Sequence, residues 1–207
     1  MGGLRIGLLA CDILKGEFEH IIGDDPDFVE KQYLEFALHA DPENMKKVIM
    51  EEAEKMLRRV DVLLLGYAVC NSLEGIDKRF SKPVIMLPGY DCIDALLGSE
   101  EYAREKKICG GTWFSSPGWA AEGTNGMIKE LHLDSVEGVP PEFFLDMLFA
   151  SYERVLHIDP GIGNNEEYQA QSEQVAKELK LRCDCRTCNL NQLEATVRKA
   201  KETAAGL

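Results

Sequence analysis

The sequence contains no long apolar run. No stretch among the 207 residues approaches the roughly 20 apolar residues that a membrane-spanning helix needs. A secretory signal peptide is not expected either, because the apolar run from Leu4 to Cys11 is too short and a charged segment follows it directly. We therefore expect a cytoplasmic protein that makes no membrane contact.

Positive charge is scarce. Lys and Arg number 23 against 36 Asp and Glu, which gives a formal net charge of −13 at pH 7. Nucleic acids and anionic lipid surfaces are bound largely through Lys and Arg. The composition therefore argues against nucleic acid and anionic membranes as partners and mainly indicates a soluble protein.

A dinucleotide-binding fingerprint and internal repeats are also missing. Gly161-Ile162-Gly163 lacks the third glycine of the fingerprint and falls late in the chain, so it does not predict NAD binding. No repeat, low-complexity tract or long linker divides the sequence. We expect residues 1–207 to form a single α/β domain, in one lobe or two.

Short apolar runs alternate with longer amphipathic segments along the chain, which is typical of α/β proteins. The continuous apolar character of the runs indicates parallel strands that are buried on both faces. The expected fold is a mostly parallel open sheet with helices on both faces. Strands are predicted at 4–10, 62–67, 84–87, 112–115, 154–158 and 181–183, and helices at 13–22, 41–58, 94–104, 125–131, 142–152, 166–179 and 190–201. The segment 28–38 fits a helix face or a strand.

Three cysteines follow apolar runs that read as strands: Cys11, Cys70 and Cys92. If these strands are parallel neighbours, their carboxyl ends lie side by side, where open α/β sheets bind ligands. A thiolate is both a nucleophile and a soft metal ligand. Three thiolates suit zinc with an open fourth position, or an iron–sulphur cluster with one open iron. The alternative is that each cysteine is a small buried apolar side chain.

A second thiol motif lies near the carboxyl terminus. Cys185 and Cys188 form a C-x-x-C that can chelate zinc or act in redox chemistry, and Cys183 lies just before it. The second cysteine pair of a zinc site and the amino-terminal half of a thioredoxin-like unit are both absent nearby. The competing interpretation, a strand-to-helix loop rich in small residues, is therefore favoured over a secondary thiol site.

Other polar and aromatic residues follow predicted strands and are candidates to line a pocket. They are Asp91, Ser115, Trp119 and Asp159. The plain interpretation of each is turn chemistry, since Asp, Ser, Pro and Gly commonly end strands. His39 falls just before a helix start at Asp41-Pro42 and could project from a loop. A lone histidine is nevertheless more often a structural hydrogen-bonding group than a ligand.

Several short motifs, in this order, resemble the domain of unknown function 1638 family. They are Ala10-Cys11, Leu38-His39-Ala40-Asp41-Pro42-Glu43, Gly66-Tyr67-Ala68-Val69-Cys70, Pro88-Gly89-Tyr90-Asp91-Cys92, Thr112-Trp113-Phe114, the run from Tyr152 to Asp159, and Arg186-Thr187-Cys188-Asn189-Leu190. The resemblance implies a cysteine pattern at Cys11, Cys70 and Cys92 with His39 as fourth metal ligand. This chain departs from the pattern at Asp91, where the family has histidine, and at Cys188, where glycine is common.

The resemblance also implies a setting, because genes of this family lie near those of corrinoid-dependent methyltransferases. We expect a metal-thiolate protein that acts in or supports corrinoid-dependent one-carbon transfer, with zinc as the first choice of metal. The corrinoid would come with a partner, either a corrinoid protein or a methyltransferase. The alternatives are an iron–sulphur protein for redox or activation, a corrinoid-binding accessory protein without catalysis of its own, and a metal-free protein. The absence of a cobalamin-binding Asp-x-His-x-x-Gly motif counts against independent corrinoid binding.

Overall fold

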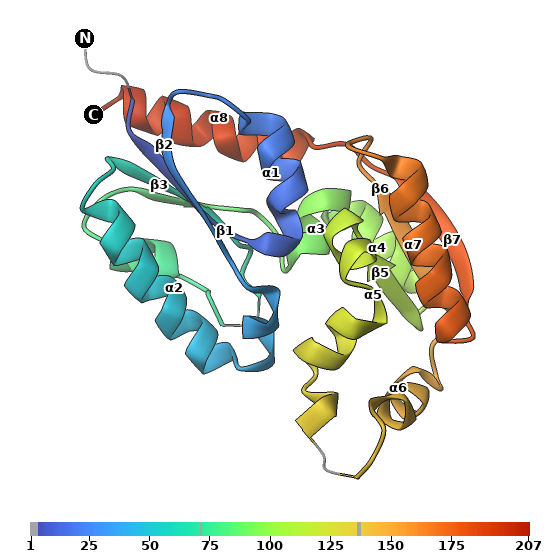
Figure 1. Ribbon diagram of the computed structural model, residues 1–207. Helices are drawn as coiled ribbons and strands as arrows, with labels where there is room; N and C mark the ends of the chain where they lie inside the picture. Colours follow the sequence, from blue (N-terminus) through green and yellow to red (C-terminus); the bar gives the residue numbers. More distant parts are fainter. Residues whose placement is uncertain (1–3, 71, 136–137) are drawn as a thin grey trace.

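A computed structural model describes residues 4–70, 72–135 and 138–207 of the chain. In this part of the chain the strands are all parallel and divide between two sheets, with the orders β2-β1-β3-β4 and β5-β6-β7 (Figure 1). The first sheet contains β1 (Ile6–Cys11), β2 (Phe28–Leu34), β3 (Val62–Gly66) and β4 (Val84–Met86), and the second contains β5 (Thr112–Ser115), β6 (Arg154–Asp159) and β7 (Arg182–Thr187). The predicted α/β class with parallel strands is confirmed, and its strands form two sheets where one was expected.

Helices connect the strands and cover the sheets. They are α1 (Lys15–Ile22), α2 (Pro42–Leu57), α3 (Cys92–Leu97), α4 (Ser99–Ile108), α5 (Pro117–Glu130), α6 (Pro141–Phe149), α7 (Asn165–Glu178) and α8 (Asn191–Ala205), with short 3-10 turns η1 (Asp12–Leu14), η2 (Phe36–Ala40), η3 (Ile76–Arg79) and η4 (Leu133–Ser135). Helix α2 covers one face of the first sheet, and α1 and α8 cover the other (Figure 1). Among the described residues, none of these helices has the length and apolar character needed to cross a membrane.

The first sheet is built almost entirely from aliphatic side chains. Every residue of β1 and of β3 is buried, as expected for central parallel strands that are covered on both faces. Gly66 ends β3 where the backbone approaches its neighbours closely, since a Cβ atom there would lie 2.4 Å from the Cβ of Ala10 and 2.7 Å from the ring of Phe18. The small residue therefore lets α1 pack directly onto the end of this strand.

The ambiguous segment 28–38 is resolved as an edge strand, β2, followed by the turn η2. Pairing with β1 along residues 28–34 decides the outcome, and this contact with a remote strand is not encoded in the pattern of the segment itself. The predicted helix start at Asp41 is confirmed. Its carboxylate accepts a hydrogen bond from the backbone N–H of Asn44 at 3.0 Å, and Pro42 occupies the first turn.

The second sheet carries buried polar side chains on both faces. On one face the Arg154 guanidinium of β6 donates to the Glu105 carboxylate of α4 at 2.7 Å and to the Thr112 hydroxyl at 2.9 Å. On the other face, Ser172 of α7 lies 3.0 Å from His157 Nδ1 and 2.9 Å from the Ser115 hydroxyl. Polar contacts therefore position α4 and α7 against this sheet.

The first sheet with α1, α2 and α3 is here called the first lobe, and the second sheet with α4, α5, α6 and α7 the second lobe. Helix α8 follows β7 of the second sheet and packs against the first sheet. Leu193, Val197 and Ala200 of this helix are buried in the core of the first sheet. The same apolar core extends to Trp119 and Ile158 of the second lobe. The lobes are therefore packed against each other along a continuous apolar core.

Candidate functional site

The strands that precede Cys11, Cys70 and Cys92 are neighbours in one parallel sheet. Register pairs β1 with β3 and β3 with β4, so the three cysteines follow adjacent strands at one edge. The loops that carry Cys70 and Cys92 are joined by a hydrogen bond from the Cys70 backbone N–H to the Tyr90 carbonyl at 2.8 Å. The strand order therefore brings three cysteines that are far apart in the sequence to the carboxyl edge of the first sheet.

The three thiols differ in exposure. Cys11 is buried as the last residue of β1, whereas Cys70 and Cys92 line a pocket and Cys92 is only half-buried. Cys70 has a left-handed backbone with φ of 42°, a conformation that non-glycine residues seldom adopt. Backbone strain of this kind is concentrated at functional sites, where surrounding structure holds it in place.

Burial keeps all three thiols protonated. It raises the pKa of Cys70 to about 12, with the Asp91 carboxylate adding to the effect. Burial of its sulphur raises the pKa of Cys92 most, and the Asp91 carboxylate adds to this effect. Burial also raises the pKa of Cys11 well above its ordinary value. Deprotonating any of these thiols requires a cation nearby, which a metal ion would provide.

Two buried polar side chains beside the thiols have no hydrogen-bond partner within the described residues. Both carboxylate oxygens of Glu17 are unpartnered, and so is the hydroxyl of Tyr67. The Glu17 side chain is fully buried, and its charge raises the pKa of Cys92. Burial raises the pKa of Tyr67, and the nearby Cys11 and Cys70 add to this effect. Buried polar groups are nearly always hydrogen-bonded, so unpartnered groups of this kind indicate a place where an ion or a water molecule binds.

The donor atoms fit a soft metal ion in their chemistry but not in their arrangement. Thiolates with a carboxylate or imidazole are the ligands of zinc. Across residues 4–70, 72–135 and 138–207, however, no group of three or more His, Cys, Asp or Glu side chains is placed so that it could hold a metal ion. Binding a metal would therefore require these side chains to move closer together.

His39 lies in η2 and lines the same pocket as Cys70 and Cys92. Its Nδ1 lies 3.0 Å from the Phe36 carbonyl oxygen, which can only accept, so Nδ1 carries the proton and Nε2 presents a lone pair. Burial lowers the pKa of His39, while the nearby Asp91 carboxylate raises it. The neutral imidazole can accept a proton or bind a metal through Nε2.

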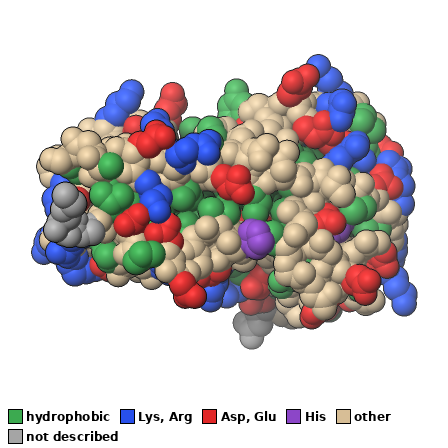
Figure 2. Space-filling view, turned by 90° about the horizontal axis from the view of Figure 1, so that it is seen from above, with side chains coloured by type: hydrophobic (Ala, Val, Ile, Leu, Met, Phe, Trp, Pro, Cys, Tyr) green, Lys and Arg blue, Asp and Glu red, His purple; other side chains and the backbone are tan. Residues whose placement is uncertain are grey.

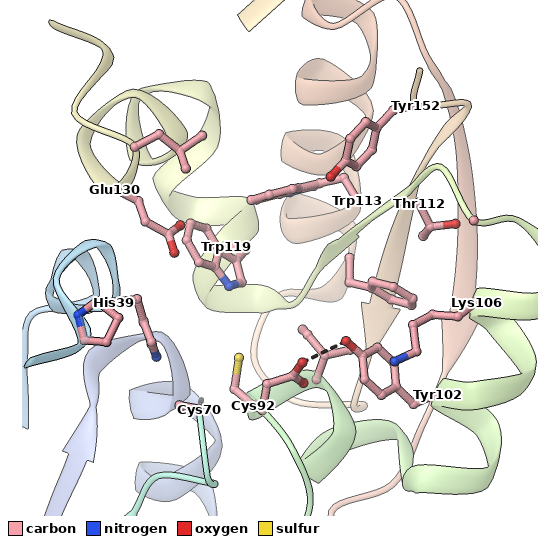
Figure 3. A pocket seen from close by; sticks show the side chains of 16 residues that line it. His39, Cys70, Cys92, Tyr102, Lys106, Thr112, Trp113, Trp119, Glu130 and Tyr152 are labelled. Carbon is pink, nitrogen blue, oxygen red and sulfur yellow. Dashed lines mark hydrogen bonds between the residues drawn. The ribbon is translucent and has the colours of Figure 1, made fainter. Parts of the chain in front are cut away.

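The pocket has a volume of about 490 Å³ and lies between the two lobes (Figure 3). The first lobe contributes His39, Pro42, Cys70, Asp91, Cys92 and Ile93, and the rest of the wall comes from Tyr102, Lys106, Gly110, Thr112, Trp113, Phe114, Trp119, Glu130, Leu131 and Tyr152. The second group is rich in aromatic side chains, and the two indole rings of Trp113 and Trp119 pack edge to face at 5.3 Å. A cavity of this size accepts a small organic molecule.

Asp91 and Trp119, both predicted pocket residues, line this cavity. The carboxylate of Asp91 begins α3 by accepting from the Asp94 backbone N–H at 2.9 Å, and it accepts from the Tyr102 hydroxyl at 2.7 Å. Trp119 lies in the first turn of α5 against Phe36 of η2, with ring centroids 5.4 Å apart. Asp91 therefore holds Tyr102 in place, and Trp119 closes the junction between the lobes.

Ser115 and Asp159, the other two predicted pocket residues, do not line this cavity. The Ser115 hydroxyl is buried against Ser172, under α7. Asp159 accepts a hydrogen bond from the backbone N–H of Gly161 at 2.7 Å, which is the turn chemistry that was the alternative. Both residues end strands of the second sheet, whose carboxyl edge is separate from that of the first.

The C-x-x-C thiols have different surroundings. The predicted loop is a strand, since β7 extends to Thr187, and Cys185 is exposed on it. Cys188 packs against the first core, where burial, followed by Glu17 and Asp159, raises its pKa to about 12. Neither residue belongs to a metal-binding group in the described part of the chain.

Sequence reasoning did not find the far wall of the pocket. Tyr102 lies on a predicted helix and Trp113 on a predicted strand, whereas Lys106 lies just beyond the predicted end of that helix at residue 104. Nothing in the spacing of these residues shows that they face Cys92. Glu130, at the end of α5, was missed for the same reason. Burial alone raises the pKa of its carboxyl to about 7.

A comparison with known protein families gives a match that covers most of the chain. A family described as "Protein of unknown function (DUF1638)" matches residues 33–197. The chain belongs to this family. The matched region contains His39, Cys70, Cys92 and the aromatic wall of the pocket, whereas Cys11 precedes it. None of the curated proteins compared with the chain matches it.

Proposed function

We propose that this DUF1638 protein binds a soft metal ion through Cys11, Cys70 and Cys92, with His39 as fourth ligand, beside a pocket for a small organic substrate. One observation carries the proposal: three adjacent parallel strands deliver three thiols to the same edge, and two of those thiols line the pocket. The unpartnered Glu17 and Tyr67 beside them support a missing bound group.

Zinc is the favoured metal, and it would act as a Lewis acid that lowers the pKa of a bound thiol or water. The chain's own residues hold the substrate and the metal. The aromatic wall at Trp113 and Trp119 excludes water from the thiols, and the Nε2 lone pair of His39 would fill the fourth ligand position. An iron–sulphur cluster on the same cysteines is the alternative occupant.

The biological setting that we propose is corrinoid-dependent one-carbon transfer. It rests on the family resemblance, and the corrinoid would be carried by a partner protein. The pocket, at about 490 Å³, is of a size for the group that receives or donates the methyl.

Metal binding tests the proposal directly. Protein purified without oxygen and titrated with Zn²⁺ or Co²⁺ should take up one equivalent per chain, measured by elemental analysis and by the thiolate–cobalt absorbance. Cys70→Ser and Cys92→Ser should each weaken cobalt binding at least about tenfold, since each removes a ligand. Cys11→Ala serves for the third position, because a serine hydroxyl would be left buried there without a defined partner.

Cys109→Ser and Cys185→Ser are the matched controls, one buried and one exposed, and both should bind cobalt like the unaltered protein. Visible absorbance of the purified protein that disappears on iron removal would identify a cluster instead of zinc. A chain that takes up neither metal nor cluster, or that keeps its metal when all three cysteines are replaced, would overturn the proposal.

A further inference from the structure

Two charged side chains that line the pocket are Glu130 and Lys106. Within the described residues, neither the Glu130 carboxylate nor the Lys106 ammonium forms a hydrogen bond or an ion pair. Lys106 Nζ instead lies over the ring of Tyr102, 3.8 Å from its centroid. The third charged side chain of the pocket, Asp91, is already engaged with the Tyr102 hydroxyl and with the backbone of α3.

Glu130 and Lys106 lie on opposite sides of the cavity (Figure 3). Glu130 comes from the end of α5 and Lys106 from α4, and Trp119, Cys92 and Tyr102 lie between them in the view. A ligand that meets both charges must therefore carry its own two charges at separate ends.

The surroundings of Glu130 favour a cation. Its carboxyl group is half-buried with no partner in the described chain, so its charged form is poorly solvated. A bound cation would stabilise the carboxylate and would lie close to the indole rings of Trp113 and Trp119, whose faces attract positive charge. At the other end, the exposed Lys106 ammonium can pair with an anionic group of the ligand.

We propose that the pocket binds a small zwitterion, with its cationic group at Glu130 and Trp119 and its anionic group at Lys106. A simple cation would leave Lys106 without a partner. A simple anion would meet Glu130 and Asp91 in a protein whose formal net charge is −13. The zwitterion satisfies both ends of the cavity. The proposal names the substrate class for the site proposed above, and it rests on that function only through the shared pocket.

Calorimetric titration with ω-amino acids of increasing length, from glycine to 6-aminohexanoate, tests the proposal. The matched probes for 5-aminopentanoate are pentylamine, which lacks the carboxylate, and pentanoate, which lacks the amine. At about pH 8, where Glu130 and the amines are charged, one member of the series should bind at least about tenfold more tightly than single-charge analogues of its own length. The preferred length reports the separation of the two subsites.

Variants assign the two ends. Glu130→Gln should remove the advantage of the amino acid over the carboxylate probe, and Lys106→Gln should remove its advantage over the amine probe. Glu166→Gln on α7 and Lys107→Gln on α4, both exposed, are the matched controls and should bind like the unaltered protein. Circular dichroism confirms that each variant is folded.

Equal binding of the three probe classes, binding of none of them, or variants that keep the full preference would each overturn the zwitterion proposal. The titrations are repeated on metal-free and cobalt-treated protein, so the two proposals fail separately. Selective zwitterion binding without metal uptake contradicts only the metal site, and metal uptake without zwitterion preference contradicts only the substrate class.

Discussion

The two lobes of this protein share one parallel architecture but are stabilised differently. The first sheet buries aliphatic strands such as β1 and β3 completely, whereas the second buries Arg154 and His157 in its central strand. On the face drawn in Figure 2, acidic and basic side chains are interspersed over the surface of the molecule. The lobes therefore differ in the side chains that they bury.

The two lobes contribute different kinds of side chain to the pocket. The apolar lobe collects thiols, because its continuous apolar strands end in loops that carry Cys70 and Cys92. The polar lobe supplies the aromatic and charged wall that faces them, from α4, β5 and α5. Apolar burial stabilises in proportion to area, whereas a buried ion pair stabilises only when every charged group keeps its partners.

The largest predicted effect comes from the ion pair of the second lobe. Arg154→Met should destabilise the protein by about 3–5 kcal/mol, because it removes the buried guanidinium that donates to Glu105 and Thr112 and leaves the fully buried Glu105 carboxylate with only the half-exposed Arg186. Urea unfolding measures the change. Arg182→Met, which removes a half-exposed arginine from the neighbouring strand, is the control and should cost no more than about 1 kcal/mol. Equal effects of the two substitutions would show that the buried pair is not special.

In the part of the first lobe that the structure describes, the Glu17 carboxyl is buried without a hydrogen-bond partner, and removing its charge should stabilise the protein. Burial raises the pKa of Glu17 from 4.5 to about 7, so the folded protein holds a proton that the unfolded chain releases between those values. Stability should therefore fall as pH rises from about 4.5 to 7. Glu17→Gln abolishes this loss and should stabilise the metal-free protein by about 3 kcal/mol at pH 8, with little effect at pH 4.5.

Urea unfolding of the Glu17 variant at several pH values tests this prediction. Glu54→Gln, an exposed position on α2, is the control and should leave the pH dependence unchanged. A stabilisation that is the same at all pH values, or a destabilisation at pH 8, would show that Glu17 is not an uncompensated charge in the free protein.

The smallest predicted effect concerns the junction between the lobes. A Cβ atom on Gly118 would lie 2.2 Å from the Ile13 carbonyl oxygen, so Gly118→Ala must push α5 away from η1. We expect a loss of about 1–3 kcal/mol, as for other overpacked sites. Gly16→Ala is the control, since its Cβ would meet only Ile162 at an ordinary 3.8 Å. Thermal unfolding that is unchanged by Gly118→Ala would show that the lobes tolerate separation here.

Much of the fold was predictable because local patterns are strong in the first lobe. Continuous apolar runs indicated β1, β3 and β4, and Asp41-Pro42 marked the start of α2. The helix boundaries of the second half of the chain were predicted less well. Helix α5 begins at Pro117, well before the predicted 125, and a predicted helix is divided into α3 and α4 at Gly98, whose φ is 83°. Glycine and proline weaken the helical pattern of these segments, because both have low helix propensity. The ends of these helices are therefore set by tertiary packing.

The order of apolar runs along the chain was enough to indicate parallel strands and to identify Cys11, Cys70 and Cys92 as strand-end residues, because strand formation and burial depend on local pattern. Three features depend on the tertiary structure alone. They are the division into two sheets, the position of Trp119 and Glu130 in the pocket of Cys70 and Cys92, and the burial of Glu17. Contacts between remote segments depend on how whole lobes pack. No spacing within a single strand or helix encodes that packing, which is why the far wall of the pocket emerged only from the structure.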